Sequence, residues 1–170
     1  MLQPYRGRCW KLPDDVSSDQ LIEAKYVFDF DPQILKQHLL KELRPEIAQQ
    51  AQPGDILFAG DNFANGSNHS HPFLAMKALG LGLVCRSISR GPYRLAVFMG
   101  IPLLTSDEAV YQAIEDGDRL EVDFAAGRIV DERSGQRHAL EPLPPYLIEI
   151  VQAGGGLEHA KQQWDRQARA

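Results

Sequence analysis

The chain has 170 residues, of which 44% are hydrophobic and 24% are charged, and its formal net charge is −5. This length and balance indicate one folded domain over 1–170 and exclude a disordered chain. A negative net charge argues against a general nucleic-acid binder, because a phosphate backbone selects a basic surface. The sequence has no long apolar run and no leader-like N-terminus, so we expect a cytoplasmic protein without a membrane segment.

In the N-terminal part, residues 6–12 predict a strand, and 16–22 predict a polar turn that leads into a short extended piece. Residues 23–30 show no clear period. A helix is expected to begin at Asp31-Pro32 and to end at Pro45, with a short second helix over 46–50. The apolar stripe of the first helix would consist of Ile34, Leu35, His38, Leu39 and Leu43.

The middle of the chain, residues 54–80, reads GDILFAGDNFANGSNHSHPFLAMKALG. It predicts a strand over 55–60, a loop of small polar residues over 61–70, and a helix with Ser70 as its N-cap and Gly80 at its end. A second apolar strand follows over 82–86. Strand, helix and strand at this spacing predict a right-handed βαβ unit with parallel strands.

The C-terminal half predicts helices over 93–99 and from 106–108 onward, then a hairpin that turns at 125–127. A proline-rich connector precedes a helix over 146–152, and the tail from about 162 is expected to fray. The sequence thus predicts an α/β fold of three layers, with a mixed sheet, parallel central strands and helices on both faces. Both cysteines, Cys9 and Cys85, lie in apolar runs, and we expect them to be buried and reduced.

The central loop is the first candidate site. A loop that ends at a helix N-terminus directs unpaired backbone N–H groups, and the positive end of the helix dipole, toward one place. Such a place can hold an anion, and it can also make the hydroxyl of Ser67 unusually acidic. The alternative is a serine that only forms a hydrogen bond in a tight loop.

Several separate marks, in the same order, resemble the small subunit of 3-isopropylmalate dehydratase, the swivelling domain of the aconitase superfamily. They are GDILFAGDNFANGS, the helix with Ala75 and Lys77, RGPYRLAVFMGIP over 90–102, the turn 116–118, and Ala153-Gly154-Gly155. The resemblance covers about 6–161. It implies the β/β/α type of three-layer fold and a cytoplasmic role in the leucine branch of branched-chain amino acid biosynthesis.

The resemblance also implies a division of labour between two subunits. A large subunit would carry a four-iron four-sulfur cluster, and this chain would bind no cofactor or metal. The small subunit would cap that site in a heterodimer or heterotetramer and supply a serine base. The reaction would remove and re-add water on a small malate-type hydroxy acid. Two cysteines by themselves do not hold such a cluster, which usually needs about three or four thiolates.

The loop matches this family only in part. Gly66 and Ser67 stand at the family's glycine and catalytic serine, and His71 at its histidine. His69 replaces an arginine, and Asn68 a second serine. Since an arginine binds a carboxylate through two parallel bonds and a histidine through one per nitrogen, the loss costs about 2–5 kcal/mol. A different substrate is one interpretation; a non-catalytic anion-binding or regulatory module that keeps the fold is the other.

The remaining candidates follow from the same resemblance. Asn68 and His69 are candidate substrate contacts, with an exposed loop histidine as the alternative for His69. Asp19, Asn62, Gly66 and His71 would support the loop. Lys25 and Arg94 are candidate substrate cations, although we favour the partner interface for Arg90 and Arg94. The expected specificity loop comprises Val27, Phe28 and Phe30; for the two phenylalanines the alternative, slightly favoured, is a place in the core.

Overall fold

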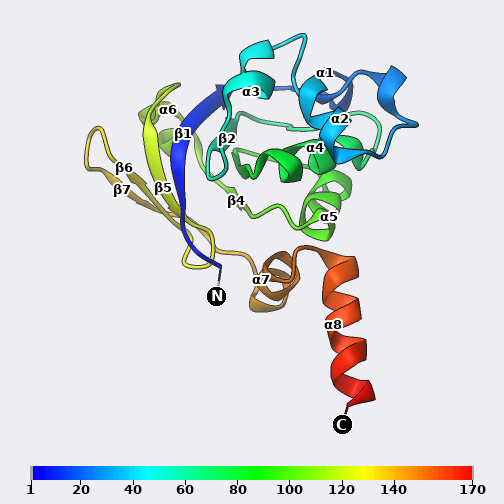
Figure 1. Cartoon of the computed structure of the whole chain (residues 1–170). Coiled ribbons are helices and arrows are strands. Elements are labelled where there is room, and N and C mark those ends of the chain that lie inside the picture. The colour runs from blue at the N-terminus through cyan, green and yellow to red at the C-terminus, as the bar shows by residue number, and fades with distance from the viewer. Residues whose placement is uncertain (1, 170) are drawn as a thin grey trace.

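The computed structural model describes residues 2–169 and contains one seven-stranded sheet with the strand order β4-β3-β2-β1-β5-β6-β7. Figure 1 shows the sheet curling, with most of the helices gathered on one side of it. The strands are β1 (Tyr5–Leu12), β2 (Ile56–Ala59), β3 (Gly82–Cys85), β4 (Leu103–Thr105), β5 (Arg119–Asp123), β6 (Arg128–Asp131) and β7 (Arg137–Ala139).

The helices confirm most of the predicted order. They are α1 (Ser18–Leu21), α2 (Pro32–Leu35), α3 (Pro45–Gln50), α4 (His71–Leu79), α5 (Arg90–Met99), α6 (Glu108–Ala113), α7 (Pro145–Gln152) and α8 (Gly156–Ala168), with the 3₁₀ turns Ala24–Tyr26 and Lys36–His38. No helix in the described part of the chain is both long and apolar enough to cross a membrane.

The predicted βαβ unit is present. Strands β1, β2, β3 and β4 pair in parallel, with Leu57 opposite Leu83 and Trp10 opposite Leu57. Helix α4 connects β2 to β3 and ends at Gly80, whose left-handed φ of 71° is a conformation that glycine adopts without strain. The predicted hairpin is β5–β6, and β5 pairs antiparallel with β1, so the sheet is mixed as expected.

Alternating side chains of the parallel strands enter two separate cores. Trp10, Leu57 and Leu83 face a core shared with α4, α5 and α7. Cys9 and Phe58 face the second core, which β5, β6 and α6 close from the other side. The antiparallel strands β5 and β6 curl over the second core and form one layer, the parallel strands form the next, and the helices around the first core form the third. This is the three-layer β/β/α architecture that was predicted.

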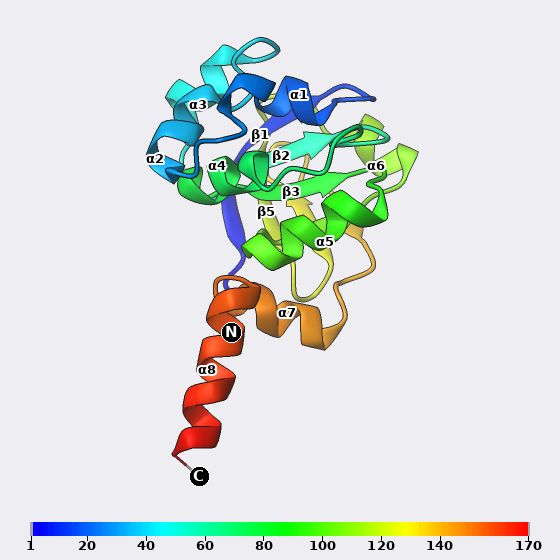
Figure 2. The same cartoon turned by 90° about the vertical axis from the view of Figure 1, so that its right-hand side faces the viewer.

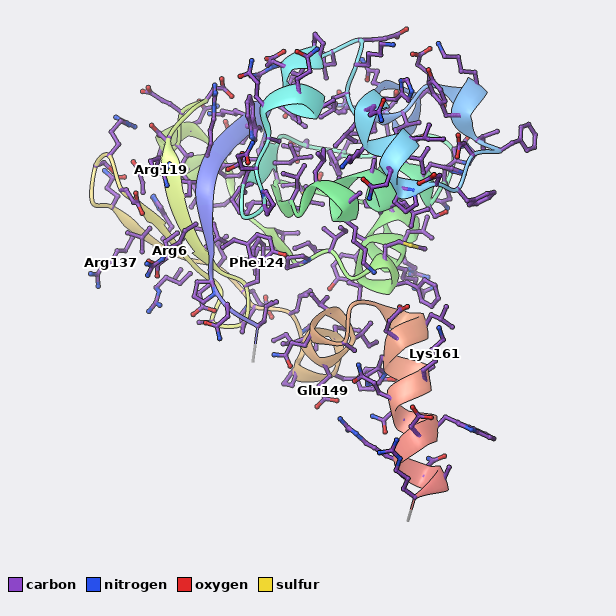
Figure 3. All side chains as sticks on the ribbon, viewed as in Figure 1. Arg6, Arg119, Phe124, Arg137, Glu149 and Lys161 are labelled. Atoms are coloured by element: carbon purple, nitrogen blue, oxygen red, sulfur yellow. The ribbon has the colours of Figure 1, made fainter. Side chains whose placement is uncertain are left out.

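Side chains on the antiparallel strands follow the same alternation. Figure 3 shows Arg6, Arg119 and Arg137 on the outer side of these strands, away from the helices. Arg6 pairs with Glu121 across β1 and β5 at 2.8 Å. Phe124 is buried, and its ring lies against Gly82, where an added Cβ would come within 2.6 Å of it. The glycine at the start of β3 is therefore needed for the close approach of the two halves of the sheet.

Asp55 joins the first two strands. Its buried carboxylate accepts hydrogen bonds from the backbone N–H of Arg8 at 2.8 Å and from the indole Nε1–H of Trp10 at 2.9 Å. It also accepts one from the backbone N–H of Gln52 at 3.0 Å. A Cβ on Gly7 would lie 2.4 Å from a carboxylate oxygen of Asp55. Any larger residue at position 7 would therefore collide with this carboxylate.

The glycine turn before α8 packs against the end of α5. Gly155 has a φ of 121°, and a Cβ there would lie 2.5 Å from the carbonyl oxygen of Phe98. Lys77 Nζ on α4 donates to the carbonyl of Gly154 at 2.5 Å. Two marks that lie far apart in the sequence, Lys77 and the segment Ala153-Gly154-Gly155, therefore meet in the fold.

Three predictions about elements were wrong. Residues 16–22 contain the short helix α1, in which Ser17 and Gln20 form a reciprocal capping box, instead of a turn and an extended piece. The helix expected from Asp31 to Pro45 stops early, because Leu40 adopts a left-handed φ of 54° and is fully buried. The tail does not fray at 162: α8 is regular up to Ala168 and extends away from the body (Figures 1 and 2).

Candidate active site

The candidate site lies at the carboxyl edge of the parallel strands. The segments that follow β1, β2 and β3 all start from this edge, and ligands in open α/β sheets usually bind there. Isolated bridges tie the segments together, from Ser17 to Asn65 and from Phe63 to Ile88. The loop with Ser67 is thus held at its base by both of its neighbours.

Backbone and side-chain bonds fix the first half of the Ser67 loop. Asn62, a predicted scaffold residue, has a left-handed φ of 55°; its backbone N–H donates to Ser87 Oγ and its side-chain amide to Asp15 Oδ1, both at 2.8 Å. The backbone N–H of Ala64 donates to the carbonyl of Val16 at 2.8 Å. Gly66 follows with a φ of 91°. These bonds and the two left-handed residues fix the course of the loop as far as Gly66.

An ion-pair cluster behind this loop was missed from the sequence. Arg86, at the end of β3, lies 2.8 Å from Asp61, 2.7 Å from Glu108 and 3.5 Å from Asp14. Asp61 also accepts a hydrogen bond from the hydroxyl of Ser87 at 2.9 Å. The partners lie 22 to 72 residues away from Arg86 in sequence, so no local pattern points to them.

Replacing Arg86 by methionine is expected to lower the free energy of unfolding by about 1–3 kcal/mol, because three carboxylates would remain close together without their cation. Denaturant unfolding measures this, and added salt should recover part of the loss. The matched control is Arg128→Met, which removes a half-exposed pair with Asp123 at 3.6 Å. Equal losses in both variants would contradict a special role for Arg86.

Ser67 is exposed at the tip of the loop. It borders a shallow hollow together with Ser18, Asn68, Pro92 and Leu95. Asn68 lies over the start of α5, where a Cβ on Gly91 would come within 2.4 Å of its amide. Ser70 occupies the N-cap position of α4 but its side chain makes no capping bond, which corrects its predicted role. The Ser67 hydroxyl is therefore open to whatever covers this edge.

The hollows beside Ser67 are too small to enclose a substrate. Their volumes are about 0 Å³ and 10 Å³, at or below the space that one water molecule needs. Ser18 borders both hollows; it is buried, and its Oγ has no hydrogen-bond partner among residues 2–169. The turn and extended piece expected over 16–22 gave Ser18 no role. The capping pair Ser17 and Gln20 was the signal that could have found it.

His71 lies under the loop, 6% exposed, and Phe30 packs against its ring with a centroid distance of 4.9 Å. Neither ring nitrogen has a hydrogen-bond partner within the described residues. His69 is half-buried, 6.0 Å from His71 between ring centroids. Burial lowers the pKa of His71, and the neighbouring His69 lowers it further. Burial of His71 therefore favours its neutral form.

This lowered pKa has a consequence for stability. Below a pH of about 6.5 the unfolded chain protonates His71 while the fold resists it, so stability is present above that pH and is lost as the pH falls toward the folded pKa. His38, whose pKa is also lowered by burial, adds to the same trend. The variant His71→Phe should lose stability less steeply between about pH 7 and 5 in urea unfolding. His159→Phe, on α8, is the control; an unchanged slope in His71→Phe would contradict the assignment.

The predicted specificity loop is at the surface. Phe28 is 91% exposed and Phe30 is 64% exposed, so the reading that placed both in the core was wrong. Val27 is half-buried and borders a hollow with His69 and His71. The segment comes after α1, where a 3₁₀ turn leaves it on the edge of the molecule. Phe30 contacts His71 just after the Ser67 loop, and Phe28 lies in the same exposed segment; we call these two rings the Phe28–Phe30 rim.

The other candidate residues, Lys25, Asp19 and Arg94, do not border the Ser67 hollow. Lys25 is exposed and pairs with Glu23, which raises the pKa of the lysine. Asp19 is exposed in the first turn of α1. Arg94 borders a different cavity, whereas Pro92 and Leu95, on the opposite side of α5, border the Ser67 hollow. The fold does not bring Arg94 to the loop.

The described residues offer no cluster of metal ligands, whether of His, Cys, Asp or Glu. Cys9 and Cys85 are both buried, free and located in strands of the sheet. Burial raises the pKa of both thiols, that of Cys85 to about 12. Because a thiolate and not a thiol binds metal, neither cysteine fits the role of a cluster ligand.

No family model matches the chain. The "3-isopropylmalate dehydratase small subunit 1" of Archaeoglobus fulgidus is 39% identical over 161 residues, covering 94% of this chain and 99% of that protein. The small subunit of Aquifex aeolicus is 38% identical over 165 residues, with 96% and 98% covered.

A solved structure agrees with these relatives. The crystal structure of 3-isopropylmalate dehydratase from Methanocaldococcus jannaschii superposes with a TM-score of 0.91 at 28% identity, covering 98% of each chain. The mixed curled sheet and its flanking helices are shared with that protein. On sequence and fold together, the chain belongs to the family of 3-isopropylmalate dehydratase small subunits.

Proposed function

We propose that this chain is the small subunit of a hydro-lyase of the 3-isopropylmalate dehydratase type and closes an active site held mainly by a large subunit. The observation that carries the proposal is an exposed serine on a pinned loop with no substrate-sized cavity of its own. A site of this kind becomes enclosed only when another surface covers it. The Phe28–Phe30 rim beside it supports such a contact, because exposed apolar patches mark interaction surfaces.

In the proposed reaction Ser67 is the base. The deprotonated Oγ of Ser67 would take a proton from one carbon of the hydroxy acid while the hydroxyl group leaves the adjacent carbon, and it would return the proton during rehydration. Its position after Gly66 and before α4 directs backbone N–H groups to the same region, which favours a negatively charged group there. Under this proposal the partner holds a four-iron four-sulfur cluster, which supplies the metal that binds the hydroxyl group leaving the substrate.

His69 and Asn68 would contact the substrate from this chain. The imidazole of His69 replaces the two parallel bonds of an arginine with one bond per nitrogen, so a carboxylate at this position is held less tightly. We propose a malate-type substrate whose group at this position differs from that of isopropylmalate. Val27 and the Phe28–Phe30 rim would contact its variable substituent, or the large subunit next to it.

The experiment is reconstitution. The chain is co-expressed with the aconitase-like large subunit of the same organism, purified through a tag on one partner only, and assayed for hydration and dehydration on malates substituted at C2 and C3. Co-purification with turnover of at least one malate is expected. A chain that fails to associate with the large subunit, or a complex inactive on the whole panel while an authentic small subunit is active, would contradict the proposal.

One observation favours a second function. Leu95 borders the Ser67 hollow, where the resemblance leads one to expect an asparagine, and His69 stands in place of the arginine. A site altered in both ways can bind an anion without catalysing a reaction. The chain would then act as an anion-binding or regulatory module, and it would associate with a large subunit without supplying its base.

A further inference from the structure

A second cavity lies between α5 and α7, on the other side of α5 from the Ser67 loop. Figure 2 shows the two helices next to each other below the sheet. The cavity has a volume of about 380 Å³, within the usual range for small-molecule sites. It is far larger than the hollows beside Ser67, and the proposed catalytic role does not use it.

Its walls are apolar side chains from two helices. Val97 and Phe98 of α5 and Leu147 and Ile150 of α7 line it, together with Tyr93. Phe98 is 52% exposed, so part of this apolar surface lies open to water. Exposed apolar walls of this extent favour an occupant with a hydrocarbon part.

Two exposed arginines lie along the edge of this apolar cavity. Arg90 and Arg94 lie one helical turn apart on α5, and both border the cavity. Neither has an acidic partner within 4.0 Å among residues 2–169, although the chain has a net charge of −5. Like charges at this spacing repel each other, so an anion between them would relieve the repulsion.

The apolar walls and the two arginines at the edge together favour one kind of ligand. We infer that the α5–α7 cavity binds a carboxylate with a short aliphatic tail, with the carboxylate at Arg90 and Arg94 and the tail between Phe98 and Ile150. The site is distinct from the Ser67 site, because Pro92 and Leu95 face Ser67 from the opposite side of α5. It needs no large subunit, so its test does not depend on the proposed function.

Hexanoate is the probe, and hexanamide is the neutral control of the same shape. Binding is followed by NMR on the chain alone, with methyl groups of Val97, Leu147 and Ile150 as reporters. Hexanoate should shift these methyl signals in a saturable way and bind at least about tenfold more tightly than hexanamide, the factor that loss of a charge-assisted bond costs. From butanoate to hexanoate, affinity should rise by about fourfold per added methylene.

Variants locate the site. Arg94→Ala should weaken hexanoate binding by about tenfold or more, and Ile150→Trp should abolish it by filling the cavity. Arg169→Ala, which removes an exposed arginine at the end of α8, should bind like the parent chain. Circular dichroism checks that each variant is folded.

Three results would overturn the inference: no saturable shift in the unmodified chain, equal affinity for hexanoate and hexanamide, or shifts confined to methyl groups outside the cavity.

Discussion

Replacing Ser67 by alanine is expected to lower turnover of the assembled hydro-lyase by about 10²–10⁴-fold, the usual contribution of a positioned general base. The substitution removes only an exposed hydroxyl, so folding and association with the large subunit should be unchanged. The measurements are kcat and KM with the best substrate of the malate panel, together with co-purification and the melting temperature of the variant. The loss should fall mainly on kcat, because a base acts in the transition state.

Ser70→Ala is the matched control. It removes a hydroxyl from the same loop, three residues further on, whose side chain makes no capping bond. The account expects this variant to keep activity close to that of the parent. If Ser67→Ala is as active as Ser70→Ala in a working complex, Ser67 is not the base. That result would support the non-catalytic interpretation of the loop.

Replacing Asp55 by alanine is expected to cost the fold about 3–5 kcal/mol. The change leaves three donors without their acceptor, namely the backbone N–H groups of Arg8 and Gln52 and the indole N–H of Trp10. Each unsatisfied buried donor costs about 1–3 kcal/mol, and the carboxylate bonds are among the stronger ones because they involve a charge. Denaturant unfolding of the chain measures the loss as a lower midpoint at an unchanged slope.

Two further variants sharpen this prediction. Asp55→Asn keeps one acceptor oxygen but turns an amino group toward a donor, so its stability should lie between those of the parent and Asp55→Ala. Asp165→Ala removes an exposed carboxylate from α8 and should change stability by less than about 0.5 kcal/mol. A loss below about 1 kcal/mol in Asp55→Ala would show that the three bonds do not hold β1 and β2 together.

The sequence allowed the parallel part of the fold to be predicted, because each signal there is local. Apolar runs of four to six residues, a polar loop and a glycine at the helix end lie within 54–86. The left-handed conformation of Gly80 and the pairing of β2 with β3 follow from these neighbouring residues. The same holds for the β5–β6 hairpin, where alternation flanks a short turn.

Features that depend on distant residues escaped prediction. The apolar stripe over 34–43 suggested one long helix, but Leu40 takes a left-handed conformation to reach the core beside α4. Phe28 and Phe30 are of a residue type that is usually buried, and their exposure is seen only in the folded structure. The cluster around Arg86 joins the ends of β1, β2 and β3, which no window of the sequence contains.

The candidate site divides in the same way. The position of Ser67 after a glycine and before a helix could be predicted, since the loop and its flanks are contiguous. Its exposure, and the lack of an enclosing cavity, depend on how α1, α4 and α5 pack. The sequence also did not predict that Arg94 borders the cavity between α5 and α7, because this depends on which side of α5 meets α7. The fold thus assigns Ser67 and Arg94 to two different surfaces.

We propose that a large subunit covers the Ser67 loop and the Phe28–Phe30 rim. Hydrogen–deuterium exchange of the chain, with and without the large subunit, tests it most directly. The account predicts slower exchange on complex formation in residues 22–31 and 61–70, with α8 largely unchanged. Unchanged exchange in both segments, with protection confined to α7 and α8, would contradict the account, because the subunits would then meet on the wrong side of the molecule.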